Sequence, residues 1–265
     1  MVIVTRRAGE AEDVAARAAS DGTERVIAVG GDGTVQEVVN GLMAAATGSA
    51  GMGIMPVGTG NDLARSLGLP RQPADAWSVA VGIQTRRIDV ARASGPSGAR
   101  WFASAGGIGF DAQVAAAMAT RSGWQRGAAG YLVTTLSELR RFSNRRVRLT
   151  IDDDTGEYAV LFVAIANGAY YGGGMRIAPD AATDDGALDV CIVGDITRMA
   201  AIRQLPNLYR GTHVNHPAVA VTRARRVRIE GGPETLAHLD GEPFGGLPLE
   251  VELVASRLTV AAPLR

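Results

Sequence analysis

The sequence predicts an N-terminal three-layer α/β domain followed by a mainly antiparallel β-sandwich domain. In the first third of the chain, apolar runs alternate with helical patterns, which is typical of parallel βαβ units. After about residue 85, short β-like runs follow one another, separated by turn residues. A length of 265 residues is sufficient for two such domains. We expect the α/β domain at residues 1–86, with a return of about 255–265, and the sandwich at 87–254.

The elements of the α/β domain follow from local patterns. Strands are expected at 2–5, 26–29 and 52–57, and helices at 10–19 and just after each of two Gly-rich turns. Apolar residues at helical spacing across residues 35–43 give the first of these later helices a buried face. The T-x-x-E spacing of Thr34 and Glu37 predicts a capping box at its start. Gly68 is expected to end the second, shorter helix.

The sandwich domain is predicted from runs rich in β-branched and apolar residues. Its strands are expected at 87–93, 100–105, 147–152, 158–166, 188–193, 219–222, 227–230 and 249–254. Helical patterns interrupt these strands at 111–118, 126–142 and 198–208.

Composition excludes several classes of protein. The 27 basic and 27 acidic residues cancel, so no nucleic-acid partner is expected. All basic residues are Arg, so a P-loop lysine is excluded. The single cysteine, Cys191, lies in an apolar run and is expected in the core. No apolar stretch reaches the roughly 20 residues of a membrane span and no cleavable signal is visible, which predicts a cytoplasmic location.

Two Gly-rich turns follow the apolar runs of the first domain, GGDGT at 30–34 and GTGND at 58–62. Glycines allow the backbone N–H groups to approach an anion closely, and a helix N-terminus adds unpaired donors and partial positive charge. Each turn carries an Asp that could bind Mg²⁺ directly or through water. The pair of turns therefore predicts a nucleotide site and phosphoryl transfer.

Several segments together resemble the bacterial diacylglycerol kinases and YegS-type lipid kinases, which are relatives of sphingosine and ceramide kinases. The matching segments are GGDGTVQEVVNGL at 30–42, PVGTGNDLAR at 56–65, IDV at 88–90, GGIGFDAQV at 106–114, NGAYYGGGMRIAPDAATDDGALDV at 167–190 and LDGEP at 239–243. The resemblance implies an ATP-binding α/β domain and a β-sandwich, with a lipid alcohol entering the cleft between them. In the family, a strand and an NPxSG loop that helps to hold nucleotide precede the segment corresponding to Thr5, and this chain begins after them.

The resemblance also assigns the residues of the nucleotide site. It implies that the backbone of 31–34 binds phosphate, and the full set of nucleotide-binding residues is Thr5, Gly30, Gly31, Asp32, Gly33, Thr34, Glu37, Thr59 and Asn61. In the family's pattern, Asp32, Asp62 and Asp89 share a water-bridged Mg²⁺. The alternatives are structural, because Asn61 or Asp62 could cap a helix and Asp89 could end a strand.

Two carboxylates in the LDGEP segment, Asp240 and Glu242, are the candidates for the general base, and Asp32 is the third catalytic candidate. Reference pKa values of free Asp and Glu side chains are near 4, so we expect both residues to be ionised at neutral pH and able to accept a proton. Asp-Gly is also a common hairpin turn, which is the alternative reading. Residues two apart can both reach a cleft from a turn, so the choice between the two carboxylates stays open.

The resemblance further implies a second, structural Mg²⁺ bound by Asp185 and by the main-chain carbonyls of Ala182 and Ala187. Hard oxygen ligands suit this ion. The alternative for the acidic Asp184–Asp185–Gly186 segment is a β-turn that binds no ion.

Positive charge gathers around the long helix predicted at 126–142. The residues concerned are Arg121, Arg126, Arg140, Arg141, Arg145, Arg146 and Arg148. Each Arg close to an anionic membrane contributes about 1 kcal/mol, so the cluster predicts transient docking, peripheral to the inner face of the membrane. The alternative is a solvated helix end.

The sequence therefore predicts an ATP- and Mg²⁺-dependent lipid kinase that phosphorylates a hydroxyl of diacylglycerol or a similar lipid alcohol. The alternatives are an NAD kinase-like phosphotransferase acting on a soluble substrate and an inactive nucleotide- or lipid-binding homologue. A homodimer is left open.

Overall fold

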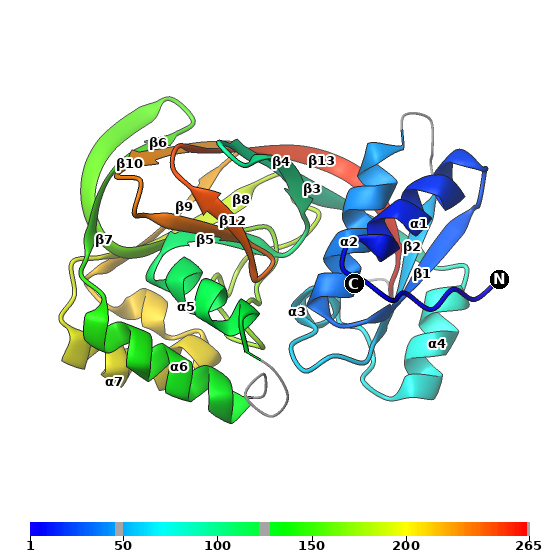
Figure 1. The fold of residues 1–265 in the computed structure, drawn as a ribbon, viewed down its shortest axis with the longest axis horizontal. Helices are drawn as coiled ribbons and strands as arrows, with labels where there is room; N and C mark the ends of the chain where they lie inside the picture. Colours follow the sequence, from blue (N-terminus) through cyan, green and yellow to red (C-terminus); the bar gives the residue numbers. More distant parts are fainter. Residues whose placement is uncertain (46–49, 122–127, 264–265) are drawn as a thin grey trace.

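An α/β lobe and a β-rich lobe lie side by side in the computed structural model, which describes residues 1–45, 50–121 and 128–263 (Figure 1). The helices of the α/β lobe are α1 (Glu10–Ser20), α2 (Asp32–Ala44), α3 (Asp62–Ser66) and α4 (Pro73–Val81). Its strands β1 (Arg25–Gly30) and β2 (Gly51–Pro56) pair in parallel. Both Gly-rich turns follow the carboxyl ends of these strands, which is where open α/β sheets bind ligands.

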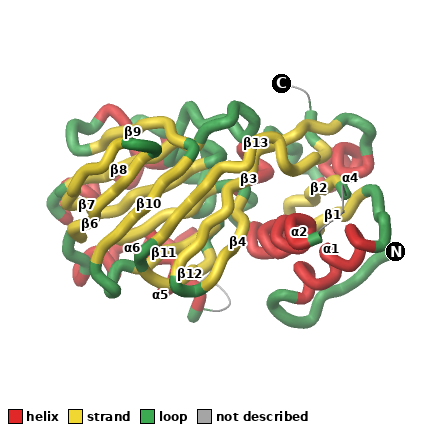
Figure 2. Tube along the Cα trace, turned by 90° about the horizontal axis from the view of Figure 1, so that it is seen from above, coloured by secondary structure: helices red, strands yellow, loops and turns green. Residues whose placement is uncertain are grey.

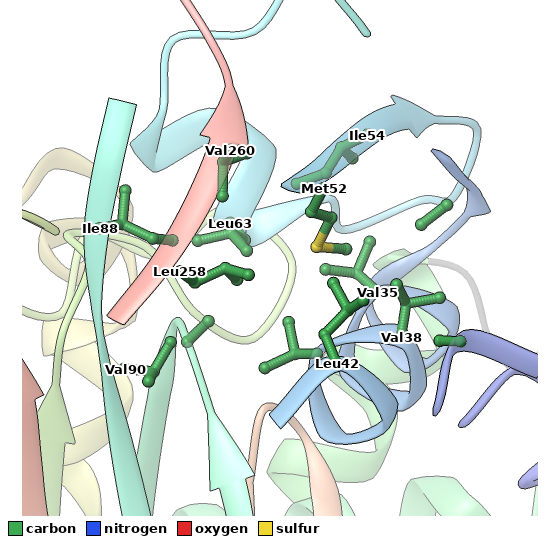
Figure 3. Close-up of a cluster of buried hydrophobic side chains, with 14 of the residues drawn as sticks. Val35, Val38, Leu42, Met52, Ile54, Leu63, Ile88, Val90, Leu258 and Val260 are labelled. Atoms are coloured by element: carbon green, nitrogen blue, oxygen red, sulfur yellow. The ribbon is translucent and has the colours of Figure 1, made fainter. Parts of the chain in front are cut away.

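The α/β lobe has three layers. Met52 and Ile54 of β2 lie on the sheet face that packs against α2, as Figure 3 shows. Gly53 points to the opposite face, where an added Cβ would lie only 2.7 Å from the carbonyl oxygen of Ala80 in α4. Glycine is required at this position because helix α4 packs directly against the strand.

Two long strands connect the lobes, β3 (Thr85–Gly95) and β13 (Leu249–Ala261), and they pair in antiparallel fashion along most of their length. Figure 2 shows both strands running from one lobe toward the other. The last part of β13 reaches β2, where Val260 pairs with Met52 in parallel. The chain thus ends in the lobe in which it began, and the two lobes share a continuous sheet.

The β-rich lobe is built almost entirely from antiparallel pairs. Its remaining strands are β4 (Gly98–Phe102), β5 (Ala105–Gly109), β6 (Arg145–Ile151), β7 (Asp154–Ala166), β8 (Leu188–Gly194), β9 (Val219–Ala224), β10 (Arg226–Gly231), β11 (Leu236–Leu239) and β12 (Glu242–Gly246). One apolar core lies between the inner faces of these strands. A second core lies between the other face of the sheet and helices α5 (Phe110–Ala119), α6 (Ala128–Arg141) and α7 (Arg198–Arg210).

The predicted fold class is confirmed, including the helix at 10–19 and the strands at 26–29 and 52–57. Cys191 is buried as expected, and burial raises the pKa of its thiol to about 12. The strand predicted at 2–5 is wrong, because these residues are exposed and lie in no strand. Helix α4 and strand β5 were not predicted, and the hairpin formed by β11 and β12 was expected only as the alternative reading of the Asp-Gly sequence.

The predicted capping box at Thr34 and Glu37 is also wrong. Helix α2 begins at Asp32, with Gly31 as the N-cap residue and no side-chain cap. Glu37 instead accepts hydrogen bonds from the amides of Gly9 (2.8 Å) and Ala11 (3.0 Å), at the start of α1. A Glu one turn into one helix therefore satisfies unpaired donors at the N-terminus of another, which local spacing cannot predict.

Within the described ranges, no helix is long and apolar enough to cross a membrane.

Candidate active site

A cleft of about 470 Å³ lies where the two lobes meet. On one side it is lined by both Gly-rich turns and on the other by the β11–β12 hairpin and the loop at 171–173. Helices α5 and α7 contribute apolar and aromatic side chains. The cleft thus combines exposed main-chain amides, carboxylates and an apolar wall.

The two Gly-rich turns pack backbone against backbone. An added Cβ on Gly58 would lie 2.4 Å from Cα of Gly31, a distance that no side chain tolerates. The amide of Val57 donates to the carbonyl of Gly30 at 3.1 Å. The Asn61 side chain closes the second turn. Its Oδ1 accepts a hydrogen bond from the amide of Gly58 (3.0 Å), and its Nδ2 donates one to the carbonyl oxygen of the same residue (2.6 Å). The turns form one rigid unit that presents its backbone to the cleft.

Asp32 ties the first turn to the second. Its carboxylate accepts hydrogen bonds from the amides of Asn61 (2.8 Å) and Asp62 (2.6 Å), at the N-terminus of α3. Gly60 is required beside it, because an added Cβ would lie 2.4 Å from Asp32 Oδ2. A negative charge is also favourable at this helix end.

Asp62 connects the second Gly-rich turn to the β-rich lobe through hydrogen bonds. Its carboxylate is buried and accepts from the amides of Gly173 (2.9 Å) and Gly174 (2.7 Å). Burial, and secondly the nearby charge of Asp32, raise the pKa of Asp62 to about 6. Two carboxylates thus face one cleft, and together they favour the uptake of a proton or a cation.

This raised pKa predicts a pH-dependent stability that Asp62→Asn should remove. A raised folded-state pKa adds stability that is fully present below the ordinary value of 3.8 and is lost as the pH rises through about 6. Relative to Asp62→Asn, the free energy of unfolding of the wild type should fall by about 3 kcal/mol between pH ~3 and pH ~8. Denaturant titrations across this range measure it. Asp75→Asn, at an exposed position of α4, is the control, and equal pH dependence in both variants would contradict the prediction.

Asp89 lies away from the cleft. It is buried and accepts hydrogen bonds from the amides of Gly186 (2.8 Å) and Ser256 (2.6 Å). The structure therefore brings Asp32 and Asp62 together but does not bring Asp89 to the same wall. Among the described residues, no group of three or more His, Cys, Asp or Glu side chains is arranged to bind a metal ion.

The β11–β12 hairpin presents both candidate bases. Its turn residues Asp240 and Gly241 have φ angles of 48° and 84°, as a tight two-residue turn requires. The Asp240 carboxylate is held by three amides, those of Ala103 (3.1 Å), Ser104 (3.0 Å) and Ala105 (3.0 Å). Burial raises the pKa of Asp240 to about 6, although these hydrogen bonds oppose the shift. Asp240 is thus both a turn residue and an anchor of the hairpin.

Glu242 is different, because its side chain is exposed and reaches across the cleft. An added Cβ on Gly33 would lie 3.4 Å from Glu242 Oε1, so this carboxylate lies beside the first Gly-rich turn. Within the described part of the chain, no residue donates a hydrogen bond to it. Glu242 is therefore available to accept a proton.

An apolar wall, which the sequence analysis missed, completes the cleft. It consists of Val35, Leu63, Ala115, Met118, Ala119, Tyr171 and Tyr209. Burial, and secondly the charge of Asp62, raise the pKa of the Tyr209 hydroxyl. These residues come from five separate segments, so only the tertiary fold reveals the wall.

The remaining predicted nucleotide residues are scattered. Thr59 lines the cleft, whereas Thr5 is exposed in the segment before α1 and does not line it. Thr34 packs against the Cα of Gly30, since an added Cβ there would lie 2.4 Å from its Oγ1. Glu37 binds the start of α1, as described above.

At the predicted structural metal site, Asp185 accepts a hydrogen bond from the amide of Ala187 (3.2 Å) and pairs with Arg223. Asp189, which the sequence analysis did not single out, lies nearby with a buried carboxylate. Its Oδ2 has no partner among the described residues, and burial raises the pKa of this group. Asp184 pairs with Arg86 at 2.8 Å.

The basic cluster divides into two parts. Arg140 and Arg141 are exposed at the end of α6, whereas Arg145 pairs with Glu234 (3.7 Å) and Arg148 with Glu157 (3.0 Å). Arg146 is exposed and Arg121 is partly buried. The predicted contribution of Arg126 lies outside the described residues.

Gly-rich turns at the ends of parallel strands, an exposed carboxylate and an apolar wall line one cleft, as expected for a lipid kinase. Residues 1–93 match the diacylglycerol kinase catalytic domain, and residues 104–262 match the YegS C-terminal NAD kinase beta sandwich-like domain. The chain therefore belongs to the family of diacylglycerol kinases and YegS-like lipid kinases.

Named relatives agree with this assignment. A diacylglycerol kinase of Mycobacterium tuberculosis is 35% identical over 98% of this chain and 84% of its own length. A protein of Chromohalobacter salexigens named probable lipid kinase YegS-like is 32% identical over 99% of this chain and 83% of its own. A crystal structure of a Bacillus anthracis diacylglycerol kinase has a TM-score of 0.73 at 25% identity, covering 98% of this chain and 84% of that chain.

Proposed function

We propose that this lipid kinase transfers the γ-phosphate of ATP, with Mg²⁺, to a hydroxyl of diacylglycerol or a similar lipid alcohol. The observation that carries this proposal is the cleft itself. The Gly-rich turns, the apolar wall and the exposed carboxylate of Glu242 all line it. Phosphoryl transfer depends mainly on such positioning and on electrostatic stabilisation.

The nucleotide would bind along the Gly-rich turns. The first turn fits a phosphate because helix α2 begins there without a side-chain cap, so the amides of its first turn have no side-chain acceptor from the N-cap residue. We assign residues 1–86 and about 255–265 to nucleotide binding and residues 87–254 to the lipid. In this assignment, Gly30, Gly33, Thr34, Thr59 and Asn61 shape the phosphate site.

Mg²⁺ fits beside Asp32 and Asp62, because the buried carboxylate of Asp62 has a raised pKa and, together with the neighbouring carboxylate of Asp32, favours a compensating cation. When bound, the ion would neutralise charge on the transferring phosphate. Asp89 would support this region indirectly, by holding the loops at Gly186 and Ser256. A separate structural Mg²⁺ at Asp185 and the carbonyls of Ala182 and Ala187 is supported by the unpartnered carboxylate oxygen of Asp189.

Glu242 rather than Asp240 is the better candidate for the general base. Three amide hydrogen bonds occupy the Asp240 carboxylate and hold it in place. The Glu242 carboxylate is exposed to the cleft and lies beside the turn that would hold the transferring phosphate. It can therefore take the proton of the acceptor hydroxyl as the bond to phosphorus forms.

Transfer of radiolabel from γ-labelled ATP tests this function. Dispersed diacylglycerol, other lipid alcohols and NAD would be compared as acceptors, and mass spectrometry would identify the product. Labelled phospholipid is expected. Labelling of NAD alone would support a soluble-substrate kinase, and nucleotide binding without transfer to any acceptor would support a non-catalytic homologue.

We further propose that helices α6 and α7 dock transiently onto the inner face of an anionic membrane. Both pack their inner faces on the same side of the sheet, so their outer faces point away from it together (Figure 1). The outer face of α7 carries Met199, Ile202, Pro206 and Tyr209 at helical spacing, and Tyr209 also lines the cleft. Exposed arginines border this face, so apolar contact and charge would act together.

The double variant Met199→Asp/Ile202→Asp should weaken membrane docking several-fold. These side chains are 58% and 38% exposed, so the change should leave the fold intact while placing two carboxylates against anionic lipid. Flotation with phosphatidylglycerol vesicles measures the bound fraction, and Val221→Asp, at a 41% exposed position on β9, is the control. If both proteins float equally, or if flotation is independent of anionic lipid, this docking face is wrong.

A further inference from the structure

A buried polar pair links the hairpin that carries Glu242 to helix α5. His238 Nε2 is 3.1 Å from Asp111 Oδ2, and the two side chains are only 3% and 6% exposed. Neither residue lines the cleft. Burial of such a pair carries a desolvation cost, so it contributes more to fixing a geometry than to stability.

The pair connects two walls of the cleft. His238 lies on β11, two residues before Asp240, and Asp111 lies in the first turn of α5. One turn further along, Ala115 and then Met118 and Ala119 line the cleft from the same face of α5. The pair therefore joins the catalytic hairpin to the apolar wall.

Local geometry around His238 adds two constraints. The register between β11 and β12 shifts between Ala237 and His238, and such bulges re-aim the chain beside active sites. On the neighbouring strand β5, Gly107 is the register partner of His238. A Cβ added there would lie 2.5 Å from Asp111 Oδ2 and 3.2 Å from His238 Nε2. The carbonyl oxygen of Val163 would lie 2.8 Å from the same Cβ, so a side chain at Gly107 would collide with the pair and with the neighbouring strand.

Further contacts fix the imidazole ring. The ring of Tyr171, itself a wall residue, lies 6.1 Å away at an interplanar angle of 31°. His238 Nδ1 has no partner within the described part of the chain. The contact with Asp111 is therefore the polar link that sets the orientation of this side chain.

We propose that His238 and Asp111 are positioning residues for phosphoryl transfer. They hold the hairpin against α5, so that Glu242 meets a hydroxyl whose lipid lies along the α5 wall. This inference rests on the proposed function. A misplacement of about 1 Å can cost about 10²-fold in rate, so loss of the pair should reduce turnover rather than nucleotide binding.

His238→Leu tests the inference against His213→Leu. His213 is the matched control because it is also buried, and it contacts the carbonyl of Ile177 (3.1 Å) rather than the hairpin. His238→Leu should lower kcat by about 10²-fold at saturating ATP and lipid and change ATP affinity, measured by calorimetry, by less than about twofold. His213→Leu should lower Tm to a similar extent while keeping kcat.

Two further measurements separate positioning from stability. His238→Gln keeps a donor for Asp111 and should recover most of the lost kcat. Amide hydrogen exchange across residues 236–246 should accelerate in His238→Leu but not in His213→Leu. If the wild type phosphorylates lipid and the two Leu variants turn over alike, the inference is overturned and the proposed function stands. If the wild type phosphorylates no lipid, the proposed function fails, and hydrogen exchange alone decides whether the pair holds the hairpin.

Discussion

Glu242→Gln is expected to lower lipid phosphorylation by about 10²-fold or more, because the amide cannot accept the proton of the acceptor hydroxyl. The substitution keeps the size and reach of a side chain that lies beside Gly33 and has no hydrogen-bond donor among the described residues. The fold should therefore be unaffected. Initial rates with radiolabelled ATP and diacylglycerol measure the loss, and calorimetry should show nearly unchanged ATP affinity.

The control for this prediction is Glu157→Gln, an exposed carboxylate that pairs with Arg148 far from the cleft and should keep the wild-type rate. Asp240→Asn provides the contrast. In Asp240→Asn, an NH₂ group replaces one of the two carboxylate oxygens that accept hydrogen bonds from three main-chain amides. The substitution should therefore lower Tm together with the rate. A Glu242→Gln enzyme with near-parental turnover, beside an inactive but stable Asp240→Asn enzyme, would reverse the assignment of the base.

Much of the fold could be predicted from local patterns. The buried face of α2 and the apolar runs of β1 and β2 have the periodicities of a helix and of parallel strands. The Gly-rich turns could be recognised because a sharp turn against another backbone requires glycine at Gly31 and Gly58. These features are encoded by neighbouring residues.

Long-range features escaped prediction for physical reasons. Glu37 has the spacing of a capping residue for α2, yet it caps α1, because a carboxylate binds whichever unpaired amides the fold brings near. Asp89 follows the family pattern of a metal-binding residue, yet its carboxylate binds amides 97 and 167 residues along the chain. The residue type indicates which groups a side chain can bind, but it does not indicate which of those groups the fold places beside it.

In the candidate site, too, some residues could be identified from local motifs and others only from the tertiary fold. Asp32, Asp62 and Glu242 could be identified because they occur in Gly-rich motifs. Tyr209 and Met118 could not, since each lies on a helix whose apolar residues resemble ordinary core positions. Only the packing of α5 and α7 beside the turns makes these side chains part of a cleft.

Gly58→Ala is expected to weaken ATP binding by at least about 10²-fold. The new Cβ would lie 2.4 Å from Cα of Gly31 and 2.9 Å from Asn61 Oδ1, so two backbones must separate. Separation would misalign amides on both turns, and each hydrogen bond to a charged phosphate contributes about 1.5–3 kcal/mol. The loss of two such bonds accounts for the expected change in affinity, which isothermal calorimetry with MgATP measures.

A graded series tests whether the distance between the turns is the cause. Gly31→Ala places its Cβ 3.2 Å from Gly58 Cα and should have an intermediate effect, because small shifts relieve the contact. Gly51→Ala, whose Cβ would lie 3.5 Å from the nearest atom, should bind ATP like the wild type. Affinity should therefore follow the order of the three distances while Tm remains high enough for all three proteins to be folded at 25 °C. If the three variants bind ATP equally well, the Gly-rich turns are not the phosphate site.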